Sequence, residues 1–248
     1  MTMTTVKRTQ ANGDTPAAVR VRGVYKGFGE GQTRIPVLKG VDLDVALGEI
    51  LLLAGPSGSG KTTLLSVIAG ILDSDGGTLN VLGSSIPELS PDAKTRFRKQ
   101  NLGFIFQQYN LLPPLTAAEN AAVPLIIRGL PRSQAIARAT EVLHEVGLGD
   151  RIDFLPAKLS GGQQQRIAIA RALVGEPRLI LCDEPTANLD GESGRKAMEL
   201  LRRIGNRPDR AMIVVTHDSR IFEFADRIAH MEDGRIEHVK QNHGRDHS

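Results

Sequence analysis

The sequence has no tryptophan and only two tyrosines and seven phenylalanines, so aromatic residues make up 4% of its 248 positions. A surface that stacks nucleic-acid bases needs several exposed aromatic rings. The 31 basic residues are scattered among 28 acidic ones, which leaves a net charge of only +3. Composition and charge therefore do not indicate nucleic-acid binding, and we expect no nucleic-acid partner.

Long apolar runs and paired cysteines are also missing. The apolar stretches in EILLLAGP and RLILCDEP end after a few residues, far short of the roughly 20 residues that a membrane-spanning helix needs. Residues 1–17 hold no apolar segment of the kind found in secretory signals, so we expect a disordered leader and a cytoplasmic protein. The single cysteine, Cys182, lies in an apolar run and is expected to be buried, without a disulfide.

Strand-like and helix-like patterns alternate along the chain. Alternating segments within 18–53 (VRVRGV, VLKGVDLDV, EILLLAG) predict antiparallel strands that lead into a buried strand. At about 115–157 two helical segments replace the strand pattern. Later, AMIVVTHD predicts a strand followed by a helix, and IAHMEDGRIEHV predicts a hairpin that turns at Asp233-Gly234.

These patterns predict an α/β fold with a mainly parallel sheet, an antiparallel β subdomain and a helical insertion subdomain. We expect one domain at 18–239, with the helical insertion at about 115–157 inside it, and a disordered tail at 240–248.

A glycine-rich segment follows the first predicted buried strand. GPSGSGKTT matches the phosphate-binding loop G-x-x-x-x-G-K-[ST] and stands between a strand and a helix, as that loop requires. Its glycines let backbone N–H groups point at phosphates, and the helix N-terminus adds positive potential. Lys61 should reach the β- and γ-phosphates of ATP, and Thr62 should bind Mg²⁺. The predicted ATP-binding residues here are Gly55, Pro56, Ser57, Gly58, Ser59, Gly60, Lys61, Thr62 and Thr63.

Two adjacent carboxylates end the predicted strand LILCDEP. Asp183 is expected to hold Mg²⁺ directly or through water, and Glu184 to polarise the attacking water as a general base. The pair alone would be unspecific, because acidic residues often follow strands. Together with the phosphate-binding loop it predicts hydrolysis of ATP.

The segment LSGGQQQR resembles the LSGGQ signature of the ABC ATPase family. Ser160, Gly161, Gly162 and Gln163 begin a predicted helix, whose N-terminus favours an anion. A serine cap followed by two glycines would fit an ordinary helix start equally well. The resemblance implies a head-to-tail homodimer, in which the signature of one chain closes on the γ-phosphate of ATP that the other chain binds.

Two further residues match the family around the γ-phosphate. Gln107, after the predicted strand GFIF, resembles the glutamine that contacts Mg²⁺ and the attacking water, with Gln108 beside it as an alternative register. His217, directly after AMIVVT, resembles the switch histidine. The resemblance therefore implies that His217 and Glu184 are the catalytic residues, and that Thr62, Gln107 and Asp183 hold the metal.

The family resemblance also covers the dimer interface and the adenine. Asn188, Leu189 and Asp190 resemble the D-loop, which crosses the dimer interface. Phe28 occupies the place of the aromatic residue that stacks on adenine, with Tyr25 as an alternative and an ordinary core role as another.

The resemblance extends over residues 18 to about 239. FIFQQYNLLPPLTAAEN and DEPTANLD are most similar to the macrolide-exporter, lipoprotein-release, cell-division and heterocyst glycolipid-exporter ATPases. This subclass implies a peripheral protein on the cytoplasmic face of the inner or plasma membrane that drives separate transmembrane permease subunits. It also allows a periplasmic adaptor, reached through the permease. The permease is expected to dock near Gln107, Tyr109-Asn110 and Arg128.

Two other functions stay open at this point. The same subclass includes regulatory ATPases of cell-envelope or division complexes. DNA-associated ABC ATPases share the motifs, but they interrupt the cassette with long coiled coils or zinc modules, which this sequence lacks. The transported substrate, the permease and the direction of transport beyond export are not indicated.

Overall fold

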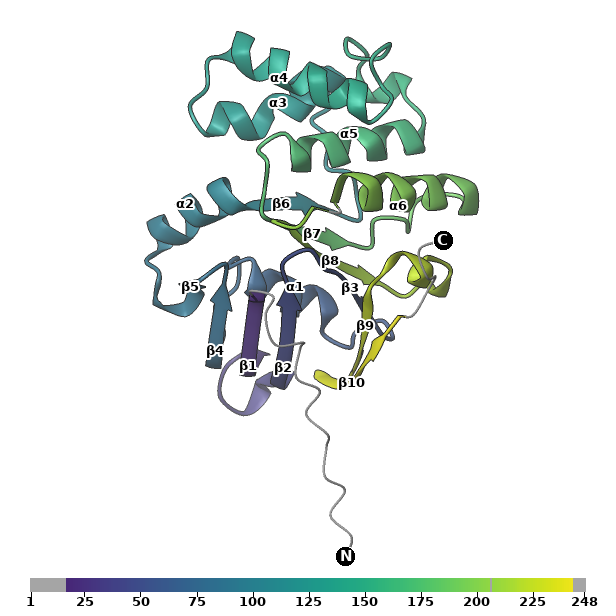
Figure 1. Cartoon of the computed structure of the whole chain (residues 1–248). Helices are drawn as coiled ribbons and strands as arrows, with labels where there is room; N and C mark the ends of the chain where they lie inside the picture. Colours follow the sequence, from purple (N-terminus) through teal and green to yellow (C-terminus); the bar gives the residue numbers. More distant parts are fainter. Residues whose placement is uncertain (1–16, 206, 243–248) are drawn as a thin grey trace, which may run out of the picture.

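Six strands form the central sheet of the structure, a computed structural model that describes residues 17–205 and 207–242 (Figure 1). The strands β3, β6, β7, β8 and β9 are joined by parallel pairs, and β10 pairs antiparallel with β9. The predicted mainly parallel sheet is confirmed. In spatial order the strands are β10 (Arg235–Gln241), β9 (Arg227–Glu232), β3 (Ile50–Ala54), β8 (Ala211–Thr216), β7 (Leu179–Asp183) and β6 (Leu102–Ile105).

A second, antiparallel sheet packs beside it. Its order is β2 (Ile35–Ala46), β1 (Ala17–Phe28), β4 (Gly76–Val81) and β5 (Ser84–Ser85). Val19 and Val21 of β1 are fully buried and Arg20 and Arg22 are exposed, which is the alternation that the sequence shows, and a register shift follows before the buried Val24. This is the predicted antiparallel subdomain.

Helices cover both faces of the central sheet. α1 (Lys61–Ile68) lies on the side of the antiparallel sheet, and α3, α4, α5 and α6 lie on the other side (Figure 1). α3 (Ala117–Ile127) and α4 (Arg132–Glu145) form the predicted helical insertion and pack on α5 (Gly161–Leu173). α2 (Pro91–Asn101) precedes β6, and α6 (Gly191–Gly205) follows β7. The helix predicted after β8 is a short 3₁₀ segment, Ser219–Phe224.

The central sheet separates two hydrophobic clusters. Leu52 of β3 faces the cluster on the helical side, and Leu51 and Leu53 face the cluster on the side of the antiparallel sheet. Both faces of the parallel strands are buried, as expected of a parallel sheet. Cys182 is 0% exposed in the helical-side cluster, and burial raises the pKa of its thiol.

The ends of the described chain differ slightly from the expected boundaries. Ala17 is the first residue of β1, and β10 continues through Lys240 and Gln241, because these residues pair with β9. The leader at 1–16 and the tail at 243–248 lie outside the described residues. Among the helices of the described residues, none combines the length and the hydrophobicity needed to cross a membrane.

Candidate functional site

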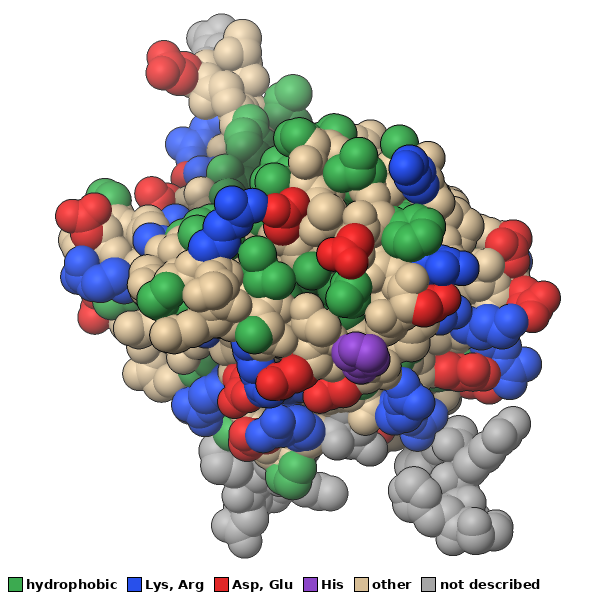
Figure 2. All heavy atoms as spheres, turned by 90° about the horizontal axis from the view of Figure 1, so that it is seen from above, with side chains coloured by type: hydrophobic (Ala, Val, Ile, Leu, Met, Phe, Trp, Pro, Cys, Tyr) green, Lys and Arg blue, Asp and Glu red, His purple; other side chains and the backbone are tan. Residues whose placement is uncertain are grey.

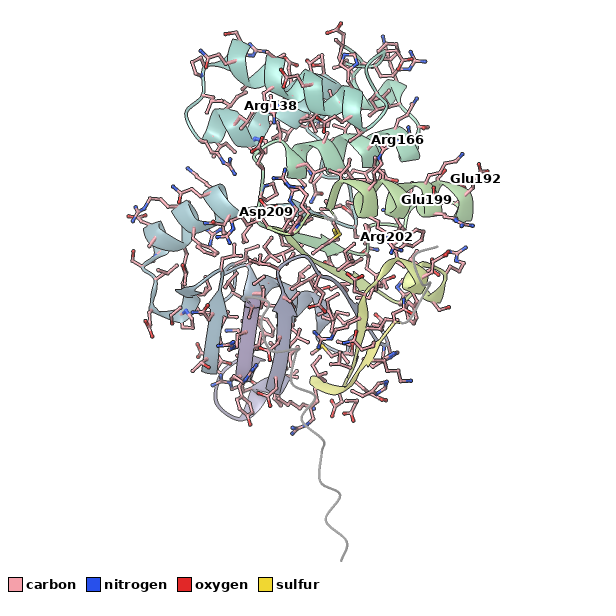
Figure 3. The ribbon with its side chains drawn as sticks, viewed as in Figure 1. Arg138, Arg166, Glu192, Glu199, Arg202 and Asp209 are labelled. Atoms are coloured by element: carbon pink, nitrogen blue, oxygen red, sulfur yellow. The ribbon has the colours of Figure 1, made fainter. Side chains whose placement is uncertain are left out.

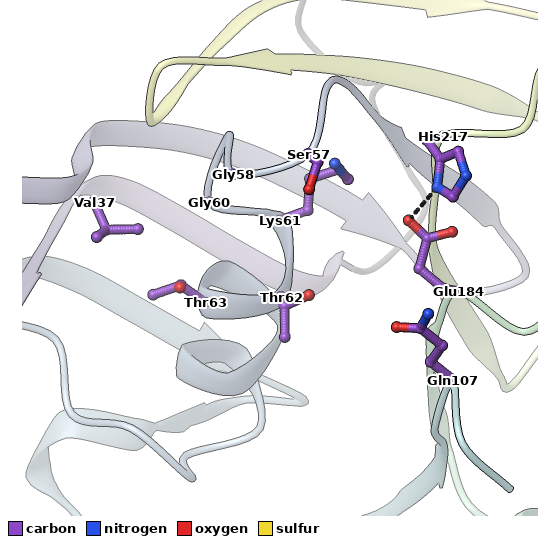
Figure 4. A pocket seen from close by; sticks show the side chains of 10 residues that line it. All are labelled: Val37, Ser57, Gly58, Gly60, Lys61, Thr62, Thr63, Gln107, Glu184 and His217. Atoms are coloured by element: carbon purple, nitrogen blue, oxygen red, sulfur yellow. Dashed lines mark hydrogen bonds and ion pairs between the residues drawn. The ribbon is translucent and has the colours of Figure 1, made fainter. Parts of the chain in front are cut away.

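The predicted chemistry-bearing residues meet at one edge of the central sheet. The segments that follow β3, β6, β7 and β8 carry them, and these four strands run parallel, so their carboxyl ends share that edge. A cleft of about 530 Å³ opens there (Figure 4). Its lining consists of Val37, Ser57, Gly58, Gly60, Lys61, Thr62, Thr63, Gln107, Glu184 and His217.

The loop between β3 and α1 is shaped by glycines. Gly55, Gly58 and Gly60 have φ values of 154°, 79° and 101°, a region that L side chains rarely adopt. α1 begins at Lys61 with no side-chain cap, so its first backbone N–H groups are free to bind an anion. The turn of the β9–β10 hairpin braces this loop, because Gly234 donates its N–H to the carbonyl of Ser59 at 3.0 Å.

Lys61 is held inside its own loop. Its Nζ donates to the carbonyl oxygens of Gly55 and Pro56 at 2.8 and 2.7 Å. The residue is 6% exposed. Burial lowers the pKa of Lys61, while the nearby carboxylates of Glu184 and Asp183 oppose that shift. The side chain thus places a desolvated ammonium group beside the uncapped start of α1, a favourable setting for a polyanion.

Thr62, which lines the cleft, bonds to Asp183 at the end of β7. Thr62 Oγ1 donates to Asp183 Oδ1 at 3.0 Å. Burial raises the pKa of Asp183, and the hydrogen bond from Thr62 lowers it. Hydroxyl and carboxylate oxygens are the hard ligands that Mg²⁺ prefers. Over residues 17–205 and 207–242 no group of three His, Cys, Asp or Glu side chains could hold a metal, so a cation here would need further ligands from phosphate and water.

Glu184 and His217 form the opposite wall. The Glu184 backbone has φ 50°, yet its N–H still pairs with the carbonyl of Val215 at 3.0 Å. This left-handed turn at the end of β7 directs the carboxylate into the cleft, where Oε1 lies 2.8 Å from Nδ1 of His217 (Figure 4). Left-handed φ values are uncommon outside glycine and often occur at functional sites. Gln107 lines the same cleft and appears below Glu184 in Figure 4.

The signature residues lie outside this cleft. Ser160 caps α5 through a reciprocal pair, in which its Oγ accepts from Gln163 N and Gln163 Oε1 accepts from Ser160 N. The cleft lining includes none of the four described residues Ser160, Gly161, Gly162 and Gln163. A Cβ on Gly161 would lie 3.1 Å from the Tyr109 hydroxyl and 3.9 Å from the carbonyl of Asn188.

The D-loop residues contact the Gln107 loop and α6. Asn188 Nδ2 donates to the carbonyl of Gln107 at 2.8 Å. Asp190 accepts backbone N–H groups of Glu192 and Ser193 at the start of α6, which lowers the pKa of its carboxylate. Leu189 is half-buried against the helical-side cluster. The contact between Asn188 and Gln107 has no signature in the sequence, because 81 residues separate the two positions.

The predicted adenine contact lies at the end of β1. Phe28 is 44% exposed, with Lys26 Nζ 5.7 Å from its ring centroid, and it is not among the residues that line the cleft. Val37 of β2 lines the cleft instead. The sequence did not indicate this residue, because the apolar pattern of a strand does not show which loop or cleft the strand lies beside. The stacking role of Phe28 stays a prediction.

Comparison with known proteins decides the family. A profile described as ABC transporter matches residues 38–187, more than half of the chain. The chain belongs to the ABC transporter ATP-binding family. The two cleft segments that follow β3 and β7 fall within the matched region.

Relatives and solved structures agree with this assignment. This ABC cassette is 45% identical to the lipoprotein-releasing system ATP-binding protein LolD 1 of Caulobacter vibrioides, over 88% of the chain and 94% of that protein. It is 44% identical to the macrolide export ATP-binding/permease protein MacB of Aggregatibacter actinomycetemcomitans, again over 88% of the chain but only 34% of that protein. The chain thus spans about a third of the length of the MacB relative.

A solved ATP-binding cassette, a dimer in a post-hydrolysis state bound to ADP and Pi, is 37% identical and superimposes with a TM-score of 0.83 over 92% of the chain and all of that structure. The fold class is therefore confirmed. The ABC cassette is an ATP-binding and ATP-hydrolysing subunit of the transporter type.

Gly55 and Gly58 offer a matched test of the phosphate-binding loop. A Cβ at Gly55 would lie 2.0 Å from the carbonyl oxygen of Met231, whereas a Cβ at Gly58 meets nothing within 4 Å. Gly55→Ala should shift the backbone against β9 and lower ATP affinity at least about tenfold, as isothermal titration would measure. Gly58→Ala should cost mainly the roughly 1–2 kcal/mol of placing an L side chain in the left-handed conformation, with no steric clash. Similar ATP affinity in both variants would contradict this reading.

Proposed function

We propose that the cassette forms a head-to-tail homodimer that hydrolyses Mg²⁺-ATP to drive transmembrane permease subunits on separate polypeptides. The observation that carries this is the single cleft that gathers the phosphate-binding loop, Gln107, Glu184 and His217 while leaving the signature segment outside it. A second chain would supply the missing wall. The dimeric form of the solved relative supports the same arrangement.

The cleft residues have distinct roles in this proposal. The phosphate-binding loop and the ammonium group of Lys61 bind the phosphates. Glu184 accepts a proton from the attacking water, and His217 holds its carboxylate in place through the 2.8 Å contact. Thr62 Oγ1, Asp183 Oδ1 and the Gln107 amide would hold Mg²⁺, which supplies charge neutralisation at the transferring phosphate when bound.

The signature segment fits the role of a second anion site. α5 is 13 residues long, and its first turn, with Ser160 exposed and Gly161–Gly162 half-buried, lies next to the D-loop. Its N-terminus adds positive potential to whatever packs on it. In the homodimer this turn faces the γ-phosphate bound by the partner chain.

A separate permease is supported by the relatives. The match extends over 94% of the LolD relative, which is named as an ATP-binding protein of a releasing system, and over 34% of the MacB relative, which is named as an ATP-binding/permease protein. We propose export or lipoprotein release as the work done, at the cytoplasmic face of the inner membrane, with any periplasmic adaptor held by the permease.

The structure adds exposed hydrophobic residues to the expected permease contacts. Arg128 Nη1 donates to the carbonyl of Gly175 at 2.8 Å, and the Tyr109 hydroxyl donates to the carbonyl of Asn188 at 3.3 Å, so both side chains brace the cassette internally. Large hydrophobic side chains on the same segments are exposed instead, namely Leu112, Ile126, Ile127 and Leu130. Seen from the helical side, hydrophobic side chains interrupt the charged ones (Figure 2). We place the permease contact on these exposed residues.

Reconstitution with the co-purifying permease tests the proposal. Because coupling is reciprocal, a permease that prefers the ATP-bound dimer must favour its closure, and we expect ATPase activity to change several-fold on reconstitution. Leu112→Asp and Ile127→Asp, at side chains that are 46% and 55% exposed, should remove that change. Basal activity of the isolated chain should stay within about twofold, since surface substitutions are usually mild.

The control is Glu141→Lys on the exposed side of α4, which should leave stimulation intact. Loss of basal activity together with stimulation would show that the exposed hydrophobic residues are not a docking surface. Failure to recover any membrane protein, with recovery of DNA instead, would favour a DNA-associated ATPase. Recovery of a permease without transport activity would favour a regulator of a cell-envelope or division complex.

A further inference from the structure

One arginine of the signature helix reaches the Gln107 loop. Arg171, in the last turn of α5, donates through Nη1 to the carbonyl of Asn110 at 2.5 Å and through Nη2 to the carbonyl of Tyr109 at 2.7 Å. Both carbonyls lie two to three residues after Gln107. A planar guanidinium that donates to two acceptors in parallel fixes their direction as well as their distance.

The surroundings of Arg171 indicate that its main interaction is with these two carbonyls. The side chain is half-buried, and burial lowers the pKa of its guanidinium. In the described part of the chain no acidic side chain forms an ion pair with it. A charge that is desolvated without a counter-ion is costly, so it persists only where it makes good hydrogen bonds.

The loop that it holds is also tied from a second side. Asn110 has φ 49°, a left-handed turn conformation that asparagine adopts more readily than most non-glycine residues and that directs its carbonyl toward Arg171. At the other end of the loop, Asn188 Nδ2 donates to the carbonyl of Gln107. The Gln107 loop is therefore fixed between the D-loop and Arg171, with Tyr109 bonded to both.

We propose that Arg171 is a positioning residue that sets Gln107 of its own chain in register with the signature segment at the other end of α5. Eleven residues separate Ser160 from Arg171, about 17 Å along a helix that rises 1.5 Å per residue. Movement of the signature segment against the nucleotide of the partner thus moves the Gln107 loop of the same chain. This inference rests on the proposed homodimer with shared sites.

Mixed dimers separate this role from a general loss of stability. Lys61→Ala silences one site, so a dimer of a Lys61→Ala chain with an Arg171→Met chain has one working site, whose Gln107 and Glu184 come from the Arg171→Met chain. In the reverse dimer, one chain carries both substitutions and the other is wild type, so the mutated chain supplies only the signature. We expect at least a tenfold loss of kcat in the first dimer, with KM changed less than threefold.

The reverse dimer should stay within twofold of a reference dimer of Lys61→Ala with wild type. Equal losses in both arrangements would overturn the proposal, because a damaged α5 would also spoil the signature. No loss in the first arrangement would overturn it as well. Arg171→Lys keeps the positive charge but cannot donate to both carbonyls in parallel, so in the first dimer it should give a kcat between those of Arg171→Met and wild type.

Hydrogen exchange of the isolated chain tests the contact without any dimer. In Arg171→Met, the backbone amides at 107–111 should exchange at least tenfold faster, while those of α5 change little. Arg138→Met is the matched control on α4 (Figure 3), because Arg138 binds only the exposed carboxylates of Glu141 and Glu176. Unchanged exchange at 107–111 would overturn the inference. An inactive reference dimer would show that one intact site does not turn over alone. The exchange result needs no dimer, so it decides the role of Arg171 even if the proposed homodimer is wrong.

Discussion

Glu184→Gln should lower kcat for ATP hydrolysis at least about a hundredfold, the range expected for loss of a general base. The amide keeps the shape of the carboxylate and can still accept a hydrogen bond from Nδ1 of His217, which lies 2.8 Å from Glu184 Oε1. ATP binding should therefore persist, and the ATP-bound dimer should accumulate. Phosphate release in single turnovers and size-exclusion chromatography with ATP would measure the two effects.

The matched control is Glu199→Gln on the exposed face of α6 (Figure 3), whose carboxylate binds only Arg195. It should hydrolyse ATP at the wild-type rate. His217→Ala tests the support that the imidazole gives to Glu184, and it should lower kcat less than Glu184→Gln does. Wild-type turnover in Glu184→Gln would refute the assignment of the base.

Mixing two inactive variants should restore activity. A Lys61→Ala chain lacks the phosphate-binding ammonium, and a Ser160→Arg chain lacks the signature, yet their heterodimer has one site with both parts intact. Purified by two different tags, this heterodimer should hydrolyse ATP at about half the wild-type rate if the two sites act independently. Each variant alone should be inactive, and wild-type activity per chain should rise with protein concentration.

A heterodimer of wild type with a Lys61→Ala, Ser160→Arg double variant is the control. It carries the same two substitutions but has no intact site, so it should be inactive. Ser160 also caps α5, and loss of such a cap costs about 1 kcal/mol, so the thermal stability of the Ser160→Arg chain must be measured alongside. Activity in this control heterodimer, with none in the mixed one, would show that each chain builds its own site.

Most of the fold follows from local patterns. The alternation of buried residues in β1, the continuous apolar run of β3 and the Asp233-Gly234 turn each depend on neighbouring residues, so the sequence shows them directly. Strand order does not, because the pairing of β3 with both β8 and β9 joins segments more than 150 residues apart. The 3₁₀ segment at Ser219–Phe224 also escaped prediction, since its apolar residues fit an α-helix equally well.

In the candidate site, too, residues in local motifs could be predicted and contacts between distant segments could not. Motif residues such as Lys61 and Glu184 could be placed because their chemistry is tied to a local loop and a strand end. The tie from Arg171 to the Gln107 loop and the tie from Gln165 Nε2 to the carbonyl of Pro185 could not, because both depend on how α5 packs. The contact of Arg128 with the carbonyl of Gly175 could not be foreseen either, because 47 residues separate the two positions.

The buried thiol of Cys182 makes the chain convenient for spectroscopy. Cys182 is the only cysteine of the sequence, it is fully enclosed, and its raised pKa suppresses the reactive thiolate. A cysteine introduced at the surface would therefore be the one thiol that a dye or spin label modifies in the folded protein, with the native residue left in place. Labels on the helical layer and beside the phosphate-binding loop could then follow the approach of two chains as a change in distance.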